Sequence, residues 1–145
     1  MTVSDFKVPI SILLAEDDED DVFFFKQALA ENDVESNLIV AKDGMEVMDI
    51  LASEPSVDII FLDINMPLKN GLECLKEINL MQNEVRAPVI ILSTTQNEDL
   101  IKNVKKLGAA GYIKKATSFI KYKLSIKDVL KKDWKTGLKP DFYIA

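Results

Sequence analysis

The chain has 145 residues, of which 48% are hydrophobic and 29% charged, a balance typical of one globular domain and not of a disordered chain. Its net charge is −6, and no apolar run is long enough to predict a membrane span. Histidine is absent, which excludes histidine-based catalysis and the commonest zinc ligand. The single cysteine, Cys74, permits no internal disulfide and the N-terminal residues lack a secretory pattern, so we expect a cytoplasmic protein.

Acidic and basic residues are segregated along the chain. Residues 114–145 hold nine lysines and three acidic residues, a net charge of +6, so residues 1–113 carry −12. A chain with this overall acidity and one arginine, Arg86, is not expected to bind nucleic acid. We interpret the lysine-rich end as the solvated face of a final helix.

Strand-like and helix-like segments alternate along the chain. In order, the pattern predicts a strand at 10–15, a helix at 22–30, a strand at 38–41, a helix at 45–52, a strand at 59–62, a helix at 71–80, a strand at 89–92, a helix at 98–107, a strand at 112–113 and a helix at 118–134. Asn97 should cap the fourth helix and Gly108 should close it. The alternation predicts a parallel α/β sheet in one domain, 1–145, with a core at about 10–134 and extensions at 1–9 and 135–145.

Polar side chains follow four of these strands at the point where each strand ends. They are the acidic run 16–21, then Asp63 with Asn65, then Ser93 with Thr94, and finally Lys114 with Lys115. The carboxyl ends of parallel strands meet at one edge of the sheet, so we expect these groups to converge. Each group taken alone could be a turn or surface residue, and residues 18–21 could form only the cap and first turn of a helix. Polar groups at the ends of four different strands together favour a site.

The chemistry of these groups fits phosphoryl transfer to a carboxylate. Clustered carboxylates repel one another unless a cation lies among them, and oxygen ligands suit Mg²⁺. A carboxylate can act as a covalent nucleophile, while an amine and a hydroxyl can bind the oxygens of the transferred group. The sequence has no glycine-rich phosphate loop and no dinucleotide fingerprint, which disfavours those nucleotide-binding classes.

Five ordered motifs resemble the receiver domains of bacterial response regulators. They occupy residues 12–18, 61–67, 70–73, 88–93 and 108–115, and the resemblance runs from about residue 11 to residue 130. It implies a flavodoxin-like, chemotaxis-regulator-like fold, a doubly wound five-stranded parallel sheet of order 2-1-3-4-5 with five helices. The acid-rich start of the first helix further resembles single-domain regulators of phytochrome-type or other hybrid sensor kinases.

The resemblance also implies roles for the residues that match the motifs. Asp63 would be the phosphoacceptor, and Mg²⁺ would be bound by Glu16, Asp17, Asp63 and the backbone carbonyl of Asn65. The acidic run leaves a one-residue shift open, so Asp18 is an alternative member of the acidic pair.

Three further positions match groups that act on the phosphoryl group or change conformation with it. Ser93 would be the switch hydroxyl, Lys115 would pair with the phosphoryl group, and Tyr112 would be the switch aromatic, turning inward on phosphorylation. Lys114 is the alternative to Lys115, and Thr94 is a further candidate beside Ser93.

By this resemblance, the chain is a stand-alone regulator of two-component signal transduction, a phosphoacceptor and not an enzyme. Its partners would be a sensor histidine kinase and a downstream protein, which binds the face of the fourth helix, fifth strand and fifth helix. That face is expected to carry Lys102, Lys105, Phe119 and Tyr122. No nucleic acid or membrane partner is expected, and a homodimer is left open.

Two alternatives to a phosphorylated regulator are kept. A small phosphatase with an aspartate nucleophile would need a second acid two residues after Asp63, where the chain has Asn65. A degenerate receiver would bind its partner without phosphorylation. This alternative is disfavoured because the chain retains Asp63, Ser93 and Lys115.

Ala116 departs from the family pattern, which has a proline here, joined through a cis peptide bond. A non-proline cis bond costs about 2.5–4 kcal/mol. We therefore predict a trans bond between Lys115 and Ala116, with the loop shifted and the long lysine side chain still reaching Asp63.

Overall fold

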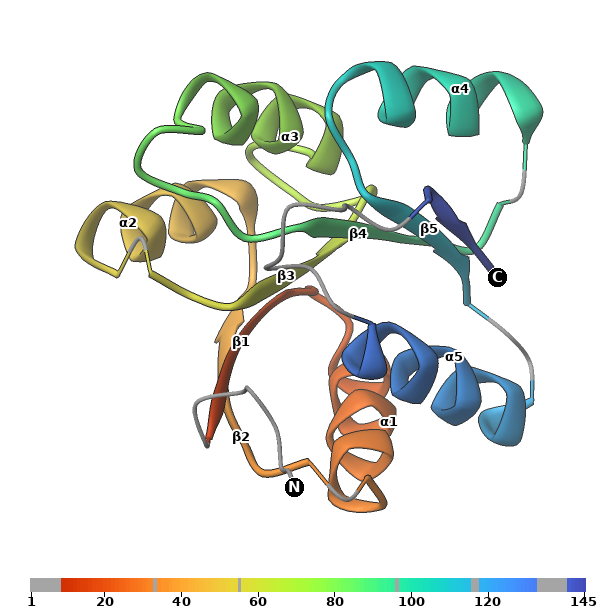
Figure 1. Cartoon of the computed structure of the whole chain (residues 1–145). Helices are drawn as coiled ribbons and strands as arrows, with labels where there is room; N and C mark the ends of the chain where they lie inside the picture. The colour runs from red at the N-terminus through yellow and green to blue at the C-terminus, as the bar shows by residue number, and fades with distance from the viewer. Residues whose placement is uncertain (1–8, 33, 55, 96, 116–117, 133–140) are drawn as a thin grey trace.

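Six parallel strands form one sheet in the part of the chain that the structure describes, with the order β2-β1-β3-β4-β5-β6 (Figure 1). The structure is a computed structural model, and it describes residues 9–32, 34–54, 56–95, 97–115, 118–132 and 141–145. The strands are β1 (Ile10–Ala15), β2 (Ser36–Ala41), β3 (Ile59–Asp63), β4 (Val89–Ser93), β5 (Gly111–Lys114) and β6 (Tyr143–Ile144). The expected order 2-1-3-4-5 is confirmed, and the sheet has one strand more than we predicted.

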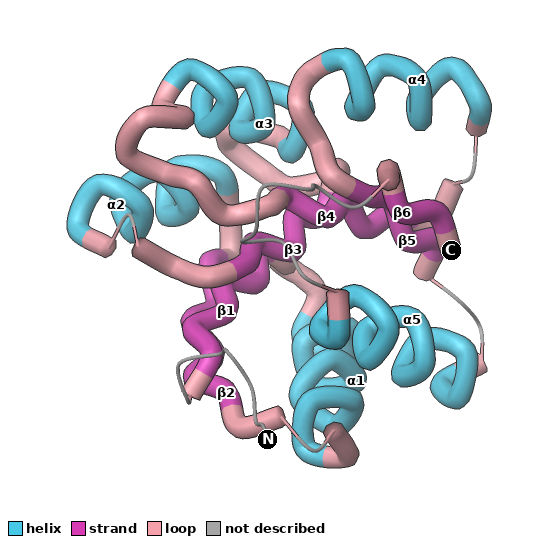
Figure 2. The backbone as a smooth tube through the Cα atoms, viewed as in Figure 1, coloured by secondary structure: helices cyan, strands magenta, loops and turns pink. Residues whose placement is uncertain are grey.

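Helices cover both faces of the sheet, so the expected doubly wound α/β arrangement is confirmed (Figure 2). One face carries α2 (Gly44–Ser53), α3 (Gly71–Leu80) and α4 (Glu98–Lys106), and the other carries α1 (Glu19–Ala30) and α5 (Phe119–Lys131). Every residue of β3 and β4 is buried, which explains why these strands read as continuous apolar runs. In the described residues, no helix is both long and apolar enough to span a bilayer.

Helix α1 begins one turn before the predicted start at residue 22. The side chain of Asp18 accepts hydrogen bonds from the backbone N–H groups of Asp20 and Asp21, so this polar segment forms the first turn instead of a loop. Hydrophobic periodicity cannot detect such a turn, because its residues are acidic. The predicted caps of α4 are confirmed: Asn97 accepts from the first turn, and Gly108 has a φ of +106°.

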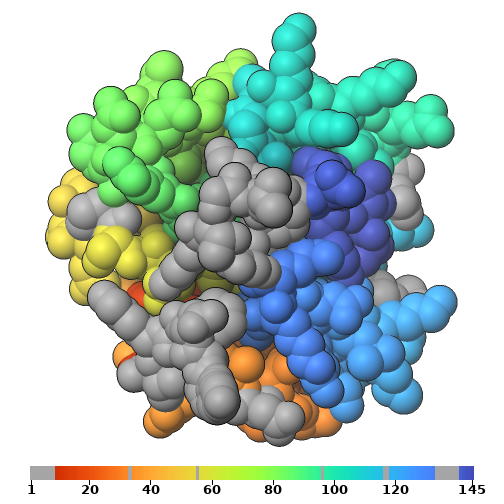
Figure 3. All heavy atoms as spheres, viewed as in Figure 1, coloured from red at the N-terminus to blue at the C-terminus, as the bar shows by residue number. Residues whose placement is uncertain are grey.

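The sixth strand comes from the end of the chain, which we expected to be an extension outside the sheet. The N–H of Tyr143 donates to the Ala110 carbonyl, and the N–H of Ala145 donates to the Tyr112 carbonyl. Phe142 packs on the core beneath α2–α4, and Tyr143 packs on the core beneath α1 and α5. Residues 141–145 thus lie between α4 and α5, where their atoms form the dark blue patch of Figure 3.

Leu68, in the loop between β3 and α3, has a positive φ of 66° although it is not glycine, and its side chain is 81% exposed. Leucine is strained in this left-handed region, whereas asparagine adopts it more readily. We expect Leu68→Asn to raise the free energy of unfolding by about 0.5–1 kcal/mol, because it relieves the backbone strain in the folded state. The exposed leucine side chain makes little packing that could be lost. Urea denaturation would measure the change.

Leu80→Asn is the matched control, since Leu80 is also exposed but lies in the last turn of α3. Asparagine is a poorer helix former than leucine, so this variant should be unchanged or slightly less stable. Equal effects at both positions would show that the backbone conformation at Leu68 is not strained.

Gly71 allows α3 to begin directly against the end of β3. A Cβ atom at this position would lie 2.4 Å from the carbonyl oxygen of Asp63 and 2.7 Å from the Cα of Ile64. Gly71→Ala should therefore push on the backbone that carries Asp63 and lower the free energy of unfolding by about 1–3 kcal/mol. The control is Lys76→Ala, at an exposed position of the same helix, which should change the free energy of unfolding little. A Gly71→Ala variant as stable as the wild type would show that a side chain at position 71 does not push on the backbone of Asp63.

Candidate functional site

The carboxyl ends of four neighbouring strands bring the predicted site residues together. Glu16 follows β1, Asp63 ends β3, Ser93 ends β4 and Lys115 follows β5. The register aligns Asp63 with Leu92 and Ser93 with Lys114, so these ends lie at the same level of the sheet. Glu16, Asp63 and Ser93 are all buried, although each carries a polar side chain.

Three carboxylates form a cluster at this edge. Glu16, Asp17 and Asp63 each offer an oxygen atom, and these atoms lie within 4.8 Å of one another. Glu16 and Asp63 are buried, whereas Asp17 is exposed to solvent. The backbone N–H of the exposed residue Asn65 donates to Asp63 Oδ1 at 3.3 Å, which fixes the orientation of that carboxylate. An all-oxygen set of this kind is compatible with a divalent cation.

Lys115 supplies the positive charge nearest to these acids. Its Nζ lies 2.6 Å from Glu16 Oε1, 2.9 Å from Asp21 Oδ2 and 3.3 Å from Asp63 Oδ2. Burial by itself would lower the pKa of the Lys115 ammonium, but its ion pairs with these carboxylates raise that pKa above its usual value. Lys115 therefore remains charged at neutral pH.

Glu16 is the most strongly perturbed acid of the cluster. Burial and the neighbouring Asp63 together raise the pKa of Glu16 to about 8, and the nearby Lys115 offsets only part of this rise. Although Glu16 Oε1 lies close to the Lys115 ammonium, it accepts no well-directed hydrogen bond in the described structure. This buried oxygen is a group that a divalent cation would stabilise in its charged form, so the residues present fit such an ion.

Ser93 and Tyr112 contact the same short segment after β4. The N–H of Thr95 donates to Ser93 Oγ at 3.1 Å, and the hydroxyl of Tyr112 donates to the carbonyl of Thr95. Tyr112 is fully buried, so its ring already occupies an inward position in this structure. Thr95 follows Ser93 and Thr94 after this strand, but the sequence assigned it no role, because its contribution is made by its backbone and leaves no side-chain pattern.

The alternative site residues lie elsewhere. Asp18 uses its side chain to cap α1, and the side chains of Thr94 and Lys114 are exposed. The backbone N–H of Lys114 donates to the carbonyl of Ala145, beside β6. Ala116, for which a trans peptide bond was predicted, lies outside the described residues, so that prediction remains untested.

The face formed by α4, β5 and α5 differs from our expectation in one residue. Lys102 and Lys105 are exposed on α4, and Phe119 is half-buried on α5. Tyr122 is instead buried against Phe25, with ring centroids 6.4 Å apart, so its predicted place on this surface is wrong. Helical spacing could not tell whether this aromatic side chain points outward or into the core.

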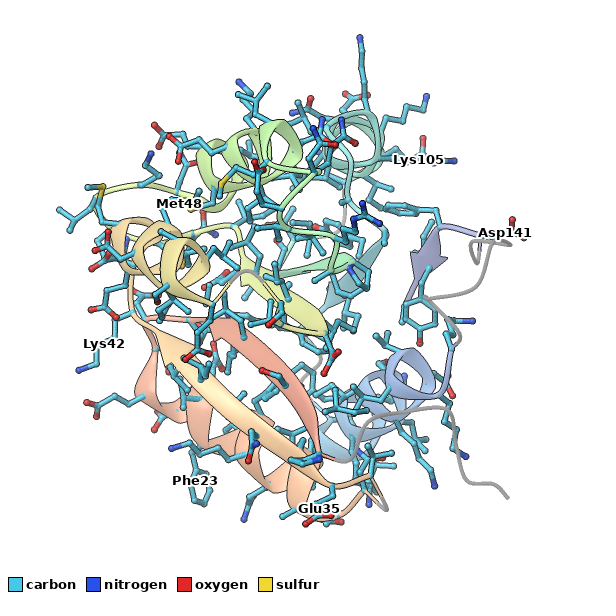
Figure 4. The ribbon with its side chains drawn as sticks, turned by 60° about the vertical axis from the view of Figure 1, so that its left-hand side comes forward. Phe23, Glu35, Lys42, Met48, Lys105 and Asp141 are labelled. Carbon is cyan, nitrogen blue, oxygen red and sulfur yellow. The ribbon has the colours of Figure 1, made fainter. Side chains whose placement is uncertain are left out.

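Residues 141–145 cover part of the same face. Lys105 Nζ lies 5.6 Å from the ring centroid of Phe142, a cation–π contact that joins α4 to the residue before β6. Figure 4 labels Lys105 and Asp141 on this side of the molecule. The edge of β5, which is the last strand in the expected order 2-1-3-4-5, is therefore paired with the chain itself.

Asp21 is a site residue that sequence reasoning passed over, because we grouped it with the solvated acids of the first helical turn. It lies in the first turn of α1 and contacts Lys115. The sequence carried no local signal for this contact, because Asp21 and Lys115 are 94 positions apart.

Comparison with known proteins places the chain in a family. Residues 12–134 match the response regulator receiver domain. The chain is 35% identical over 97 residues to the response regulator Rcp1 of Synechocystis sp., a match that covers 63% of this chain and 66% of Rcp1. It is 34% identical over 123 residues to the transcriptional regulatory protein MalR of Bacillus subtilis, covering 85% of this chain and 51% of MalR. The chain thus spans about two thirds of one relative and half of the other.

Solved structures of similar proteins have the same fold. The crystal structure of the Mn²⁺-bound form of Rcp1 superposes with a TM-score of 0.77 at 28% identity, covering 91% of this chain and 99% of that one. The phosphorylated cyanobacterial phytochrome response regulator RcpA gives a TM-score of 0.79 at 32% identity, covering 92% and 100%. Since the family match takes in every strand end that contributes to the site, the chain belongs to the response regulator receiver domains of two-component signal transduction.

Proposed function

We propose that this receiver accepts a phosphoryl group from a sensor histidine kinase on Asp63 and passes the signal on through a changed protein-binding surface. The observation that carries the proposal is the buried Asp63 carboxylate, which has the Lys115 ammonium 3.3 Å from Oδ2 and two further acids beside it. Carboxylates of this kind are known covalent acceptors of phosphoryl groups. The chain acts in this proposal as a phosphoacceptor and not as an enzyme with a separate substrate.

The transfer step conserves atoms and charge. An oxygen of Asp63 attacks the phosphorus of a phosphohistidine on the kinase, a phosphorus–oxygen bond forms, and the phosphorus–nitrogen bond breaks. The electron pair of the broken bond stays on the ring nitrogen, which gives neutral imidazole when the other ring nitrogen carries a proton. Lys115 would bind the oxygens of the transferred group, and Ser93 would donate its hydroxyl proton to one of them.

The cation that fits this site is Mg²⁺. Glu16, Asp17, Asp63 and the Asn65 carbonyl would hold it, and it would supply positive charge between the acids and the phosphoryl oxygens. The support is the all-oxygen cluster and the raised pKa of Glu16. The Rcp1 structure contains Mn²⁺, which prefers similar oxygen ligands.

The output of phosphorylation is proposed to run through Thr95. If Ser93 turns toward the phosphoryl group, Ser93 Oγ no longer accepts from the Thr95 N–H, and the carbonyl that holds Tyr112 moves with the same residue. Tyr112 lies in β5, between β4 and β6, so a change there reaches the face of α4, β5 and α5. A downstream protein would recognise that face.

A cytoplasmic location is part of this proposal. Cys74 is a free, buried thiol, as expected in a reducing compartment.

Labelling with acetyl phosphate and Mg²⁺ tests the acceptor and the metal ligands together. Wild-type protein should gain one phosphoryl group at Asp63, and Asp63→Asn should gain none. Asp17→Asn should lose at least 90% of the labelling rate without unfolding, because it removes a metal ligand on the surface. Mass spectrometry measures the label, and circular dichroism checks the fold.

Asp20→Asn is the matched control, since Asp20 is an exposed acid near Asp17 and lies outside the acidic cluster. It should label at the wild-type rate. Rapid turnover of many phosphoesters would favour the phosphatase alternative. If neither the wild type nor any variant is labelled, the degenerate receiver is favoured. Normal labelling of Asp17→Asn would overturn its assignment as a metal ligand.

Amide hydrogen exchange tests the proposed path to the surface. Addition of beryllofluoride with Mg²⁺, which mimics the phosphoryl group, should change exchange at Thr95 and Tyr112. Residues of β2, such as Ile39, should not change, because β2 lies on the other side of β1 from the site. Identical exchange at Tyr112 with and without the mimic would show that the switch does not run through this residue.

A further inference from the structure

Asp21 makes a contact with Lys115 that the proposed reaction does not use. Its Oδ2 accepts a hydrogen bond from Lys115 Nζ at 2.9 Å, across 94 positions of sequence. Asp21 is not part of the carboxylate cluster that fits a metal ion, which consists of Glu16, Asp17 and Asp63. Its contact with the lysine therefore has to be explained separately.

Three carboxylates compete for the one ammonium group, and Asp63 is the most distant of them. Nζ lies 2.6 Å from Glu16, 2.9 Å from Asp21 and 3.3 Å from Asp63. Within the described residues, only the contact to Asp21 has the geometry of a directed hydrogen bond. The ammonium thus lies closer to Glu16 and to Asp21 of α1 than to the acid that would receive the phosphoryl group.

The fold fixes Asp21 in a position to do this. Asp18 accepts hydrogen bonds from the backbone N–H groups of both Asp20 and Asp21, so the first turn of α1 is anchored. The Asp21 side chain is 35% exposed, whereas that of Lys115 is 12% exposed. When the lysine moves away, water can reach the Asp21 carboxylate, so the exchange of partners is not blocked by a stranded buried charge.

We propose that Asp21 is a positioning residue that restrains Lys115 and so weakens its pairing with a phosphoryl group on Asp63. This inference rests on the proposed function, in which Asp63 is the acceptor and Lys115 its cationic partner. In the resting site, Asp21 holds the ammonium, and on phosphorylation Lys115 exchanges this partner for a phosphoryl oxygen. Removing the Asp21 charge takes away one of the two carboxylates that lie closer to the ammonium than Asp63 does, and it also reduces the repulsion of an incoming anion.

The test is the affinity for beryllofluoride in the presence of Mg²⁺, followed by the amide NMR signals around Asp63. An oxygen of Asp63 donates a lone pair to beryllium in place of a bound water, so binding reports the acceptor site directly. Asp21→Asn should bind about fivefold more tightly, the change expected when one part-exposed ion pair no longer competes. Asp21→Glu, which keeps the charge, should bind as the wild type does.

Asp20→Asn is again the matched control, because it removes the same charge from the same helical turn without a contact to Lys115 in the described structure. Its affinity should stay at the wild-type value. A gain in affinity cannot come from a loosened fold, so the sign of the effect separates positioning from structural damage. Thermal unfolding of each variant checks that the fold is intact.

The outcomes separate this inference from the function on which it rests. If the wild type neither binds beryllofluoride nor is labelled at Asp63, the proposed function fails. If the wild type binds but Asp21→Asn shows no gain, a loss, or the same gain as Asp20→Asn, the role of Asp21 is overturned and the function stands. Tighter binding by Asp21→Asn alone, with Asp21→Glu unchanged, supports the inference.

Discussion

One ammonium group among buried carboxylates is the interaction on which the rest of the site depends. Glu16 and Asp63 lie almost completely inside the protein, where an uncompensated charge is costly. Lys115 compensates them in part, yet the pKa of Glu16 remains raised to about 8. The carboxylates of Glu16, Asp17, Asp21 and Asp63 outnumber this one ammonium, an imbalance that is compatible with a divalent cation and would make the site sensitive to a change of charge at Asp63.

The sheet keeps these charged groups together because the strands that carry them are buried in the core. The strands β3 and β4 are buried along their whole length, and their last residues are Asp63 and Ser93. Gly71 lets α3 start against the backbone of Asp63, where any side chain would collide with its carbonyl oxygen. Apolar packing thus fixes the backbone, and the polar residues at its ends have little freedom to relax away from one another.

The same sheet connects the site to the surface. Tyr112 lies in β5, hydrogen-bonds to Thr95 beside the site, and accepts a backbone hydrogen bond from Ala145 on its other side. In the proposed switch, a rearrangement at Ser93 would act on a strand whose outer edge is already paired with β6. A partner that binds the face of α4, β5 and α5 meets residues 141–145 as part of that face.

The sequence alone determined the strand and helix alternation, the caps of α4 and the position of every polar group at a strand end, because these depend on local periodicity and on short motifs. It could not determine the sixth strand, since two residues at the end of the chain carry no periodic pattern and β6 exists only through its pairing with β5. It also missed the burial of Tyr122 and the contact between Asp21 and Lys115. Each of these depends on which distant segments pack together, and a distance of 2.9 Å across 94 positions of sequence is decided only by the tertiary fold.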